Sequence, residues 1–316
     1  MAKAILSTVL AFLLPLVLLS AEASVPGGRG EADTAGTEET GSERQGPFGR
    51  RSESSGEREI RALAQAYPDR IVESGFRDRD WAIRIDDTWY YWAQGRMLPE
   101  ELRAGWADYA SYRFYAYSLK LPEVPRLDEE ARGRLAQWLE ASEQNPPRRH
   151  EGFLGALYRA RTRGETESRI QKVRFLDFEV SVHEYLAEPL AAVERRLRRL
   201  LQTSEETREF VAGLKGFAGY NWRPIAGTRS RSYHSYGIAI DLVPRSYRGL
   251  HVYWRWAMPQ EKEWYSLPYD RRWMVPQPFV RAFEEEGFVW GGKWFFFDTI
   301  HFEYRPEILV LARRAR

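Results

Sequence analysis

The stretch SYHSYGIAIDL, residues 232–242, sets the pattern for the second half of the chain. Apolar residues alternate with other residues from position 238 onward, which predicts a β-strand. The residues predicted to face the core are Ile238, Ile240 and Leu242. Asp241 then shares the opposite face with the small Ala239, which leaves room for a partner to approach. A carboxylate on an apolar strand is costly unless a cation or hydrogen-bond donors meet it, so we expect such a partner at Asp241.

His234 lies seven residues before Asp241, and on one straight strand the two side chains would point in opposite directions. Gly237 lies between them and permits a bend that brings both to one point. Taken alone, a buried histidine is more often a satisfied core residue than a metal ligand, and a strand aspartate more often caps or pairs with arginine. This stretch by itself is therefore a weak indication of a metal site.

A second stretch, DTIHFEY at residues 298–304, repeats the pattern. His301 and Glu303 share one face of a predicted strand whose other face is apolar, and Asp298 lies just upstream at a predicted turn. A catalytic zinc site uses three protein ligands and one open position for water. The two histidines and Asp241 supply three such ligands, and a further carboxylate near the water can accept its proton.

Three motifs in this order resemble a known family. They are Ser232-x-His234-x-x-Gly237-x-Ala239-x-Asp241, Trp290-Gly291-Gly292-x-Trp294 and Asp298-x-x-His301-Phe302-Glu303. Together they resemble the zinc D-alanyl-D-alanine carboxypeptidase family, which includes the VanY and VanX enzymes and the L-alanyl-D-glutamate endopeptidases of phage lysins. The resemblance covers about residues 170 to 316. It implies an α+β fold with a small central antiparallel sheet and flanking helices, as in the hedgehog signalling domain.

The resemblance also implies a role for each matching residue. Zn²⁺ is the implied cofactor, with His234, Asp241 and His301 as its ligands. Asp298, three residues before the last ligand, is the implied catalytic base. Arg223 matches a family arginine that steadies the polarised carbonyl or the substrate carboxylate, and a plain surface arginine is the alternative interpretation.

Two further residues match family positions, and two other positions differ from the family pattern. Ser232 is expected to hydrogen-bond the substrate or a ligand, and Glu303 to orient the last histidine. Lys293 stands where an aspartate is common. Asp298 stands where the VanX-like branch has glutamate, which is closer to the endopeptidase branch. The departures leave the substrate specificity open.

A long segment dense in Trp, Tyr and Arg, from Pro244 to Pro276, separates the ligands in the sequence. We expect it to form a wall over the cleft, and packing against the amino-terminal region is the alternative. His183 and His251 are interpreted as structural or surface residues.

The amino terminus has the layout of a secretory signal peptide over residues 1–23. Lys3 precedes the apolar run Ala4–Leu19, and Ala21-Glu22-Ala23 offers the small residues that a signal peptidase reads. The run is short for a membrane anchor and contains Pro15. No cysteine lies near the cleavage point, which excludes a lipid-anchored lipoprotein.

Composition divides the rest of the chain into three parts. Residues 24–59 are rich in Gly, Ser, Glu, Arg and Thr and predict a disordered linker. Residues 60–145 predict an amino-terminal α+β region of unassigned role, and residues 146–316 the peptidase domain. Because the chain has no cysteine, its folded part must be large enough to hold together without disulfides.

Local patterns predict the elements of both folded parts. In the first, alternation over residues 79–85 and the aromatics at 89–92 predict a hairpin. Its aromatic side chains can stack on sugar rings, but burial in the core is the commoner outcome. Helices are expected at residues 99–117, 128–141 and 278–286. A further helix is expected to begin at Pro189, and another after Thr203, which has capping-box spacing to Glu206. Further strands are expected at residues 172–180, 219–226, 238–243 and 300–304.

The sequence therefore predicts an exported zinc metallopeptidase, periplasmic or wall-associated in a bacterium, that acts on peptidoglycan stem peptides. Removal of a terminal D-alanine and cleavage inside the stem both stay open. The alternatives are a non-catalytic zinc-containing wall-binding module of the same fold and a metal-free protein that binds through its aromatic hairpin. The 47 basic and 45 acidic residues nearly cancel, which argues against a nucleic-acid partner. We expect a monomer that is free of the membrane after signal cleavage.

Overall fold

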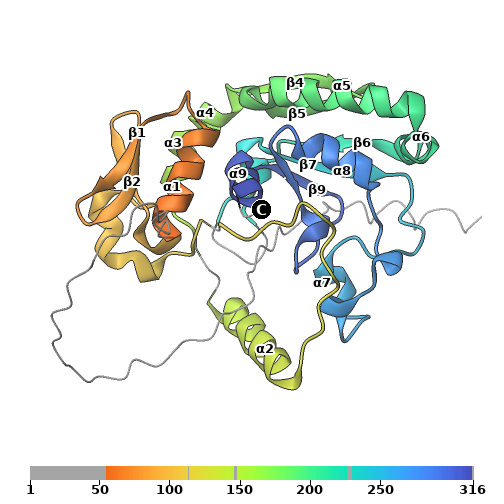
Figure 1. Ribbon diagram of the computed structural model, residues 1–316, viewed down its shortest axis with the longest axis horizontal. Coiled ribbons are helices and arrows are strands. Elements are labelled where there is room, and N and C mark those ends of the chain that lie inside the picture. The colour runs from red at the N-terminus through yellow and green to blue at the C-terminus, as the bar shows by residue number, and fades with distance from the viewer. Residues whose placement is uncertain (1–54, 113, 146–147, 226–229, 315–316) are drawn as a thin grey trace, which may run out of the picture.

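A four-stranded antiparallel sheet brings the two motif stretches side by side. This computed structural model describes residues 55–314, except residues 113, 146–147 and 226–229. The described residues form helices and small antiparallel sheets, so the predicted α+β class is confirmed (Figure 1). The predicted signal peptide and most of the predicted linker lie outside the described residues.

The central sheet has the strand order β6-β7-β9-β8. Its strands are β6 (Leu214–Ala218), β7 (Ala239–Pro244), β9 (His301–Tyr304) and β8 (Phe288–Trp290). Asp241 pairs with His301 and Ala239 pairs with Glu303 across β7 and β9. Directly opposite residues share a face of an antiparallel pair, so the polar face that the alternation predicts is present. The apolar face is buried at Ile240.

Two helices cover the apolar face of the central sheet. They are α5 (Ala187–Thr203) and α8 (Gln277–Glu284), which pack against each other. Phe283 of α8 lies with its ring centre 4.3 Å from that of Phe302 in β9. The hairpin of β4 (Ile170–Phe175) and β5 (Phe178–His183) and the short α6 (Glu205–Ala212) lie along the same upper side of the molecule (Figure 1). Burial of these rings fixes the sheet from one side and leaves its polar face for the site.

The amino-terminal part contains its own three-stranded sheet. Its strands are β1 (Ile71–Arg77), β2 (Asp80–Ile85) and β3 (Thr88–Tyr91), in that order. The predicted hairpin is therefore present, and its Tyr90 and Tyr91 are buried rather than displayed to solvent. Helix α1 (Ser55–Ala66) packs against the last helix, α9 (Pro306–Arg314), so the two ends of the described chain lie together (Figure 1).

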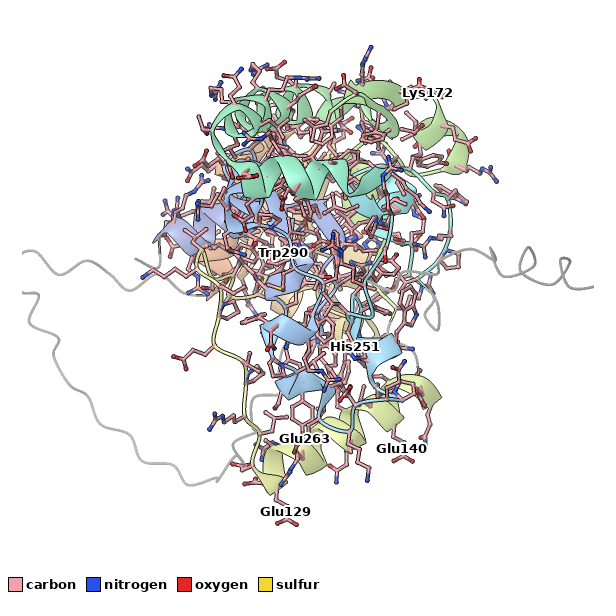
Figure 2. All side chains as sticks on the ribbon, turned by 90° about the vertical axis from the view of Figure 1, so that its right-hand side faces the viewer. Glu129, Glu140, Lys172, His251, Glu263 and Trp290 are labelled. Carbon is pink, nitrogen blue, oxygen red and sulfur yellow. The ribbon has the colours of Figure 1, made fainter. Side chains whose placement is uncertain are left out.

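Several elements connect these layers. They are α2 (Glu129–Gln144), α3 (Gly152–Leu157), α4 (Arg163–Glu167), α7 (Trp254–Ala257) and the 3-10 helices η1 (Ala93–Gly95), η2 (Glu100–Asp108), η3 (Glu184–Leu186), η4 (Tyr233–Tyr236), η5 (Trp264–Ser266), η6 (Tyr269–Arg271) and η7 (Gly291–Lys293). Trp290 lies in the middle of the molecule, with Lys172 towards one end and Glu129 of α2 at the other (Figure 2). Among the described helices, none has the length and apolar character that crossing a bilayer requires.

Some predicted boundaries are wrong. The single strand expected at 172–180 is a hairpin, because Leu176 and Asp177 take positive φ and form its turn. No strand forms at 219–225, and the strand lies just before it as β6. Of the helix expected at 99–117, only η2 is helical, with 3-10 geometry.

The helix starts also differ from the predicted ones. Ser204, and not Thr203, caps α6 by accepting a hydrogen bond from the Thr207 N–H. Helix α1 begins at Ser55 and so includes the last five residues of the predicted linker. An ion pair of 2.7 Å between Arg61 and Glu57, one helical turn apart, supports that early start.

We predict that Gly237→Ala destabilises the protein far more than Gly249→Ala. Both glycines have positive φ, 69° and 73°. A Cβ at Gly237 would lie 2.5 Å from a side-chain carbon of Ile170 and 2.7 Å from the backbone N of His183, whereas a Cβ at Gly249 meets nothing within 4 Å. Urea unfolding is expected to show a loss of about 1 kcal/mol for Gly249→Ala and about 3 kcal/mol or more for Gly237→Ala. Equal losses would contradict the packing argument.

Candidate metal centre

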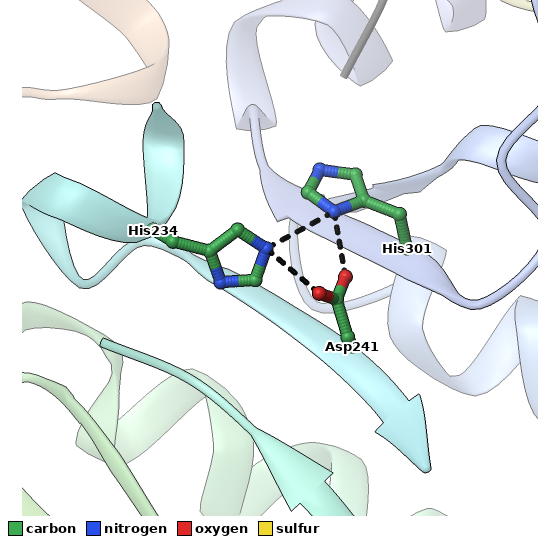
Figure 3. Close-up of side chains that lie close together, drawn as sticks. All are labelled: His234, Asp241 and His301. Carbon is green, nitrogen blue, oxygen red and sulfur yellow. Dashed lines mark hydrogen bonds and ion pairs between the residues drawn. The ribbon is translucent and has the colours of Figure 1, made fainter. Parts of the chain in front are cut away.

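Three side chains from two strands and a 3-10 helix converge at the polar face of the central sheet. His234 Nε2 lies 3.1 Å from a carboxylate oxygen of Asp241 and 3.3 Å from His301 Nδ1. His301 Nδ1 lies 2.9 Å from the other oxygen of Asp241 (Figure 3). All three side chains are buried. The structure thus brings together the three residues that the sequence predicts as ligands.

Local backbone geometry directs His234 into this cluster. It lies on η4, where the Ser232 hydroxyl accepts a hydrogen bond from the His234 N–H at 3.3 Å. Gly237 ends the turn in the left-handed conformation and returns the chain into β7, so the predicted bend is present. His234 Nδ1 donates to the Gly219 carbonyl at 2.7 Å, which turns Nε2 towards Asp241. Ser232 therefore holds a predicted ligand in place.

His301 is held from the side away from the cluster. Its Nε2 lies 3.4 Å from a carboxylate oxygen of Glu303, so it donates outward while Nδ1 faces Asp241. The ring of Trp294 packs beside it, with ring centres 5.6 Å apart. Glu303 is fully buried and also accepts a hydrogen bond from Arg305 at 3.2 Å. The orienting contact that the sequence predicts for Glu303 is present.

The cluster places one buried carboxylate between two imidazoles, so its charge balance depends on a proton or a metal ion. Burial by itself would raise the pKa of Asp241, but the two histidines more than offset this and hold its pKa well below the usual range. Burial would lower the pKa of His301, whereas its hydrogen bonds to Asp241 and Glu303 raise it to about 10. With no other cation, the cluster therefore holds a proton on His301. A metal ion can take the place of that proton, since metal binding releases protons from its ligands.

The spacing of the donor atoms fits such an ion. Four ligands at about 2.0–2.1 Å from a tetrahedral zinc ion lie about 3.3 Å from one another. The two histidine nitrogens lie 3.3 Å apart, and each lies 2.9 or 3.1 Å from one of the two Asp241 oxygens, close to that value. Imidazole nitrogens with a carboxylate oxygen form a donor set that zinc accepts. The residues present therefore fit a divalent metal of this kind.

Asp298 lies beside the cluster but outside the three-residue group. It is fully buried, and within the described part of the chain neither of its carboxylate oxygens makes a hydrogen bond. Burial raises the pKa of Asp298 well above its ordinary value, His301 opposes the rise and Asp241 adds to it. The carboxylate is thus within electrostatic range of the ligands. Its raised pKa is a property that a general base near neutral pH needs.

Tyr253 pairs directly with Asp298, a contact that sequence reasoning missed. The backbone hydrogen bonds that flank the pair measure 2.8 and 3.0 Å. This is the pairing in which opposite side chains share a face and approach most closely. Tyr253 is buried, and its hydroxyl has no hydrogen-bond partner among the residues that the structure describes. The face beside the base therefore carries a hydroxyl that can donate to a bound molecule.

The backbone of Arg223 lies beside the turn that carries His234, since its carbonyl accepts from the Ser232 N–H at 3.2 Å. Burial lowers the pKa of Arg223, while Asp241 and Asp298 act in the opposite direction, so the guanidinium is within electrostatic range of both carboxylates. Its backbone is tied to η4, because the Ser235 hydroxyl accepts from the Arg223 N–H at 2.9 Å. The half-buried Arg223 is thus near the site, as the sequence predicts, rather than a remote surface residue.

The aromatic segment from Pro244 to Pro276 both borders the site and packs against the amino-terminal part, the two alternatives that the sequence left open. Tyr253 borders the site as described above. Farther along the segment, the hydroxyls of Ser266 and Tyr269 each donate at 2.6 Å to backbone carbonyls of Pro125 and Pro122. The segment therefore lines one side of the site and also packs on residues of the amino-terminal part.

The Trp-Gly-Gly-x-Trp element supports the base and leaves Lys293 away from the ligands. A Cβ at Gly291 would lie 2.5 Å from the backbone oxygen of Asp298, so only glycine permits this approach. Lys293 Nζ forms a buried ion pair of 2.5 Å with Glu284 and donates to the Leu119 carbonyl at 3.2 Å. The departure from the family at Lys293 is thus a packing feature.

The remaining histidines lie outside the metal cluster. His183 accepts from the Tyr185 N–H and lies 2.8 Å from the Tyr158 carbonyl, which agrees with a structural residue. His251 lies 3.4 Å from a carboxylate oxygen of Glu261. His150 lines a small cavity with Arg96 and Arg231, and none of the three clustered residues lines it.

Comparison with known families assigns the segment that carries this cluster. Residues 226–304 match the family described as D-alanyl-D-alanine carboxypeptidase, and residues 59–114 match a domain of unknown function. No curated protein and no solved structure matches the chain at a significant level. The first match contains the three clustered residues, Asp298 and Glu303, and it confirms the resemblance predicted from the motifs. The segment at residues 226–304, which carries the cluster, is thus similar to the D-alanyl-D-alanine carboxypeptidase family.

Proposed function

We propose that this protein is an exported zinc metallopeptidase that hydrolyses peptide bonds in peptidoglycan stem peptides. One observation carries the proposal: the buried cluster of His234, Asp241 and His301 lies beside Asp298, a buried carboxylate without a hydrogen bond in the described chain. Three ligands and a separate base are the parts that metal-assisted hydrolysis requires. The family match supports a peptidase, and the amino-terminal signal pattern supports a periplasmic or wall-associated location.

His234, Asp241 and His301 would hold the zinc ion. When bound, zinc supplies Lewis acidity that polarises a carbonyl and makes water more acidic. Asp298 accepts the proton from the attacking water, because burial raises the pKa of its carboxylate and so favours proton uptake. Arg223 stabilises the negative charge that develops on the carbonyl oxygen. Asp298 then returns the proton to the leaving amine.

The substrate class follows from the family rather than from a cavity. A D-alanyl-D-alanine carboxypeptidase removes the terminal D-alanine of the stem, and the related endopeptidase reaction cuts inside the stem. Both reactions need the same metal, base and oxyanion donor, so the residues of the cluster do not distinguish them. Product masses do distinguish them, since one reaction releases free D-alanine and the other a longer fragment.

Replacement of each proposed ligand is expected to abolish tight metal binding. His234→Ala, Asp241→Ala and His301→Ala should each weaken zinc affinity by more than the roughly 10–100-fold typical of changes to outer contacts. His251→Ala is the matched control, because it removes a histidine outside the cluster and should retain zinc. Metal content of the purified variants and competition with a chelator give the measurement. Full zinc retention in a ligand variant would exclude this cluster as the site.

Asp298→Asn is expected to keep zinc and to lose hydrolysis. A neutral amide cannot accept the proton, so the rate should fall by about 10²–10⁴-fold. Purified peptidoglycan is digested with the wild type, the variant and the chelated wild type, and the products are identified by mass. A zinc-loaded wild-type protein that releases no product would favour the non-catalytic wall-binding module.

Arg223→Gln is expected to lower kcat/KM by about 10²–10³-fold without changing zinc content, because it removes charge that stabilises the developing oxyanion. Arg248→Gln is the control, since Arg248 is an exposed arginine on the aromatic segment. Steady-state kinetics on a stem pentapeptide give the measurement. Equal activity in the two variants would place Arg223 outside the reaction.

A further inference from the structure

A continuous set of buried hydrogen bonds runs from the metal cluster to the amino-terminal part of the chain. His301 contacts Glu303 at 3.4 Å, and Arg305 donates to the other oxygen of Glu303 at 3.2 Å. Arg305 Nε also donates to Glu307 at 2.5 Å. Glu303, Arg305 and Glu307 are all fully buried. One guanidinium therefore lies between two carboxylates, the first of which orients a proposed zinc ligand.

Two tyrosines of the amino-terminal part complete the far end of this set. The Tyr67 hydroxyl donates to one oxygen of Glu307 at 3.0 Å, and the Tyr112 hydroxyl donates to the other at 3.1 Å. The Tyr158 hydroxyl lies 2.9 Å from that of Tyr67, so it donates to Tyr67 Oη. Tyr67 and Tyr112 both lie within the segment that matches a domain of unknown function. That segment therefore supplies two of the donors that satisfy Glu307.

Because Glu307 is buried, its hydrogen bonds from Tyr67 and Tyr112 affect the position of Arg305. A buried carboxylate that loses its donors must either take a proton or draw its remaining partner closer. Glu307 has Arg305 as that partner, and Arg305 also holds Glu303. Arg305 in addition donates to the Tyr233 hydroxyl at 3.0 Å, next to His234 in the chain. A shift of Arg305 would thus reach both histidines of the cluster.

We propose that Tyr67 and Tyr112 are positioning residues for the metal centre, acting through Glu307, Arg305 and Glu303 on His301. The amino-terminal part is then a structural component of the peptidase rather than an independent wall-binding module. Outer contacts of metal ligands commonly change metal affinity when they are altered. The inference rests on the proposed metal site and assigns a role to the segment at residues 59–114.

The test measures zinc affinity of the full chain by competition with a chelator. Tyr67→Phe/Tyr112→Phe removes the two phenolic donors to Glu307, leaves Arg305 as its donor, and should weaken zinc binding by about 3- to 10-fold. Tyr91→Phe is the matched control, because its hydroxyl donates to Asp78 at 2.7 Å within the amino-terminal sheet. That control should leave zinc affinity unchanged. Thermal unfolding of the metal-free proteins reports any loss of stability separately, and Tyr112→Phe alone provides a milder change if the double variant folds poorly.

A double-mutant cycle shows whether the tyrosines act through Glu303. Glu303→Gln should weaken zinc binding by about 10–100-fold. In that background, the two Tyr→Phe changes should have no further effect on zinc affinity, because the contact they control is already lost. Unchanged zinc affinity in Tyr67→Phe/Tyr112→Phe, or effects that simply multiply in the Glu303→Gln background, would overturn the inference. Zinc binding without peptidoglycan digestion would overturn the proposed peptidase, and the same affinity comparison would still decide the inference.

Discussion

The antiparallel register of β7 on β9 is the constraint on which the site depends. It places Asp241 directly opposite His301 and Ala239 opposite Glu303. A slip by one residue would turn every one of these side chains to the other face, where phenylalanines of α8 and β9 pack. The apolar packing on one face therefore fixes the register that brings the polar groups together on the other. Ala239 has no side chain large enough to fill the space beside Asp241.

Burial of charge is the second constraint, and it extends well beyond the cluster. Asp241, Asp298, Glu303 and Glu307 are all buried in one region of the molecule. Leaving an ionised carboxylate unpaired in a low-dielectric interior costs several kcal/mol, about the stability of a whole domain. Asp241, Glu303 and Glu307 accordingly have donors beside them, and the pKa of Asp298 is raised. Arg305 donates to Glu303 and Glu307, and two phenolic hydroxyls also donate to Glu307. The residues around Asp241 and His301 fit a divalent ion, which would add positive charge at that end of the region.

The need of Glu307 for hydrogen-bond donors also connects the amino-terminal part to the peptidase domain. Helix α1 packs against α9, and the tyrosines that follow it in the chain donate to Glu307. Tyr90 and Tyr91 of the amino-terminal sheet are buried, which is the commoner of the two outcomes that the sequence left open, whereas Trp89 and Trp92 are half-buried. The aromatic segment after β7 adds a further connection, through Ser266 and Tyr269, to the loop before α2. The two predicted parts on either side of residue 145 therefore share packed and hydrogen-bonded contacts.

The sequence by itself determined the α+β class, the polar face of β7 and β9, the bend at Gly237 and the three converging residues. These follow from periodicity and from motif spacing, which are local properties of the chain. Only the tertiary structure placed Tyr253 opposite Asp298 and the tyrosines against Glu307, because Tyr67 and Glu307 are 240 residues apart. The alternation of His301, Glu303, Arg305 and Glu307 was a visible signal of a charged face, but its partners lie on distant elements. No local pattern specifies such contacts, since they arise when separate elements pack and each buried charge must find its donor.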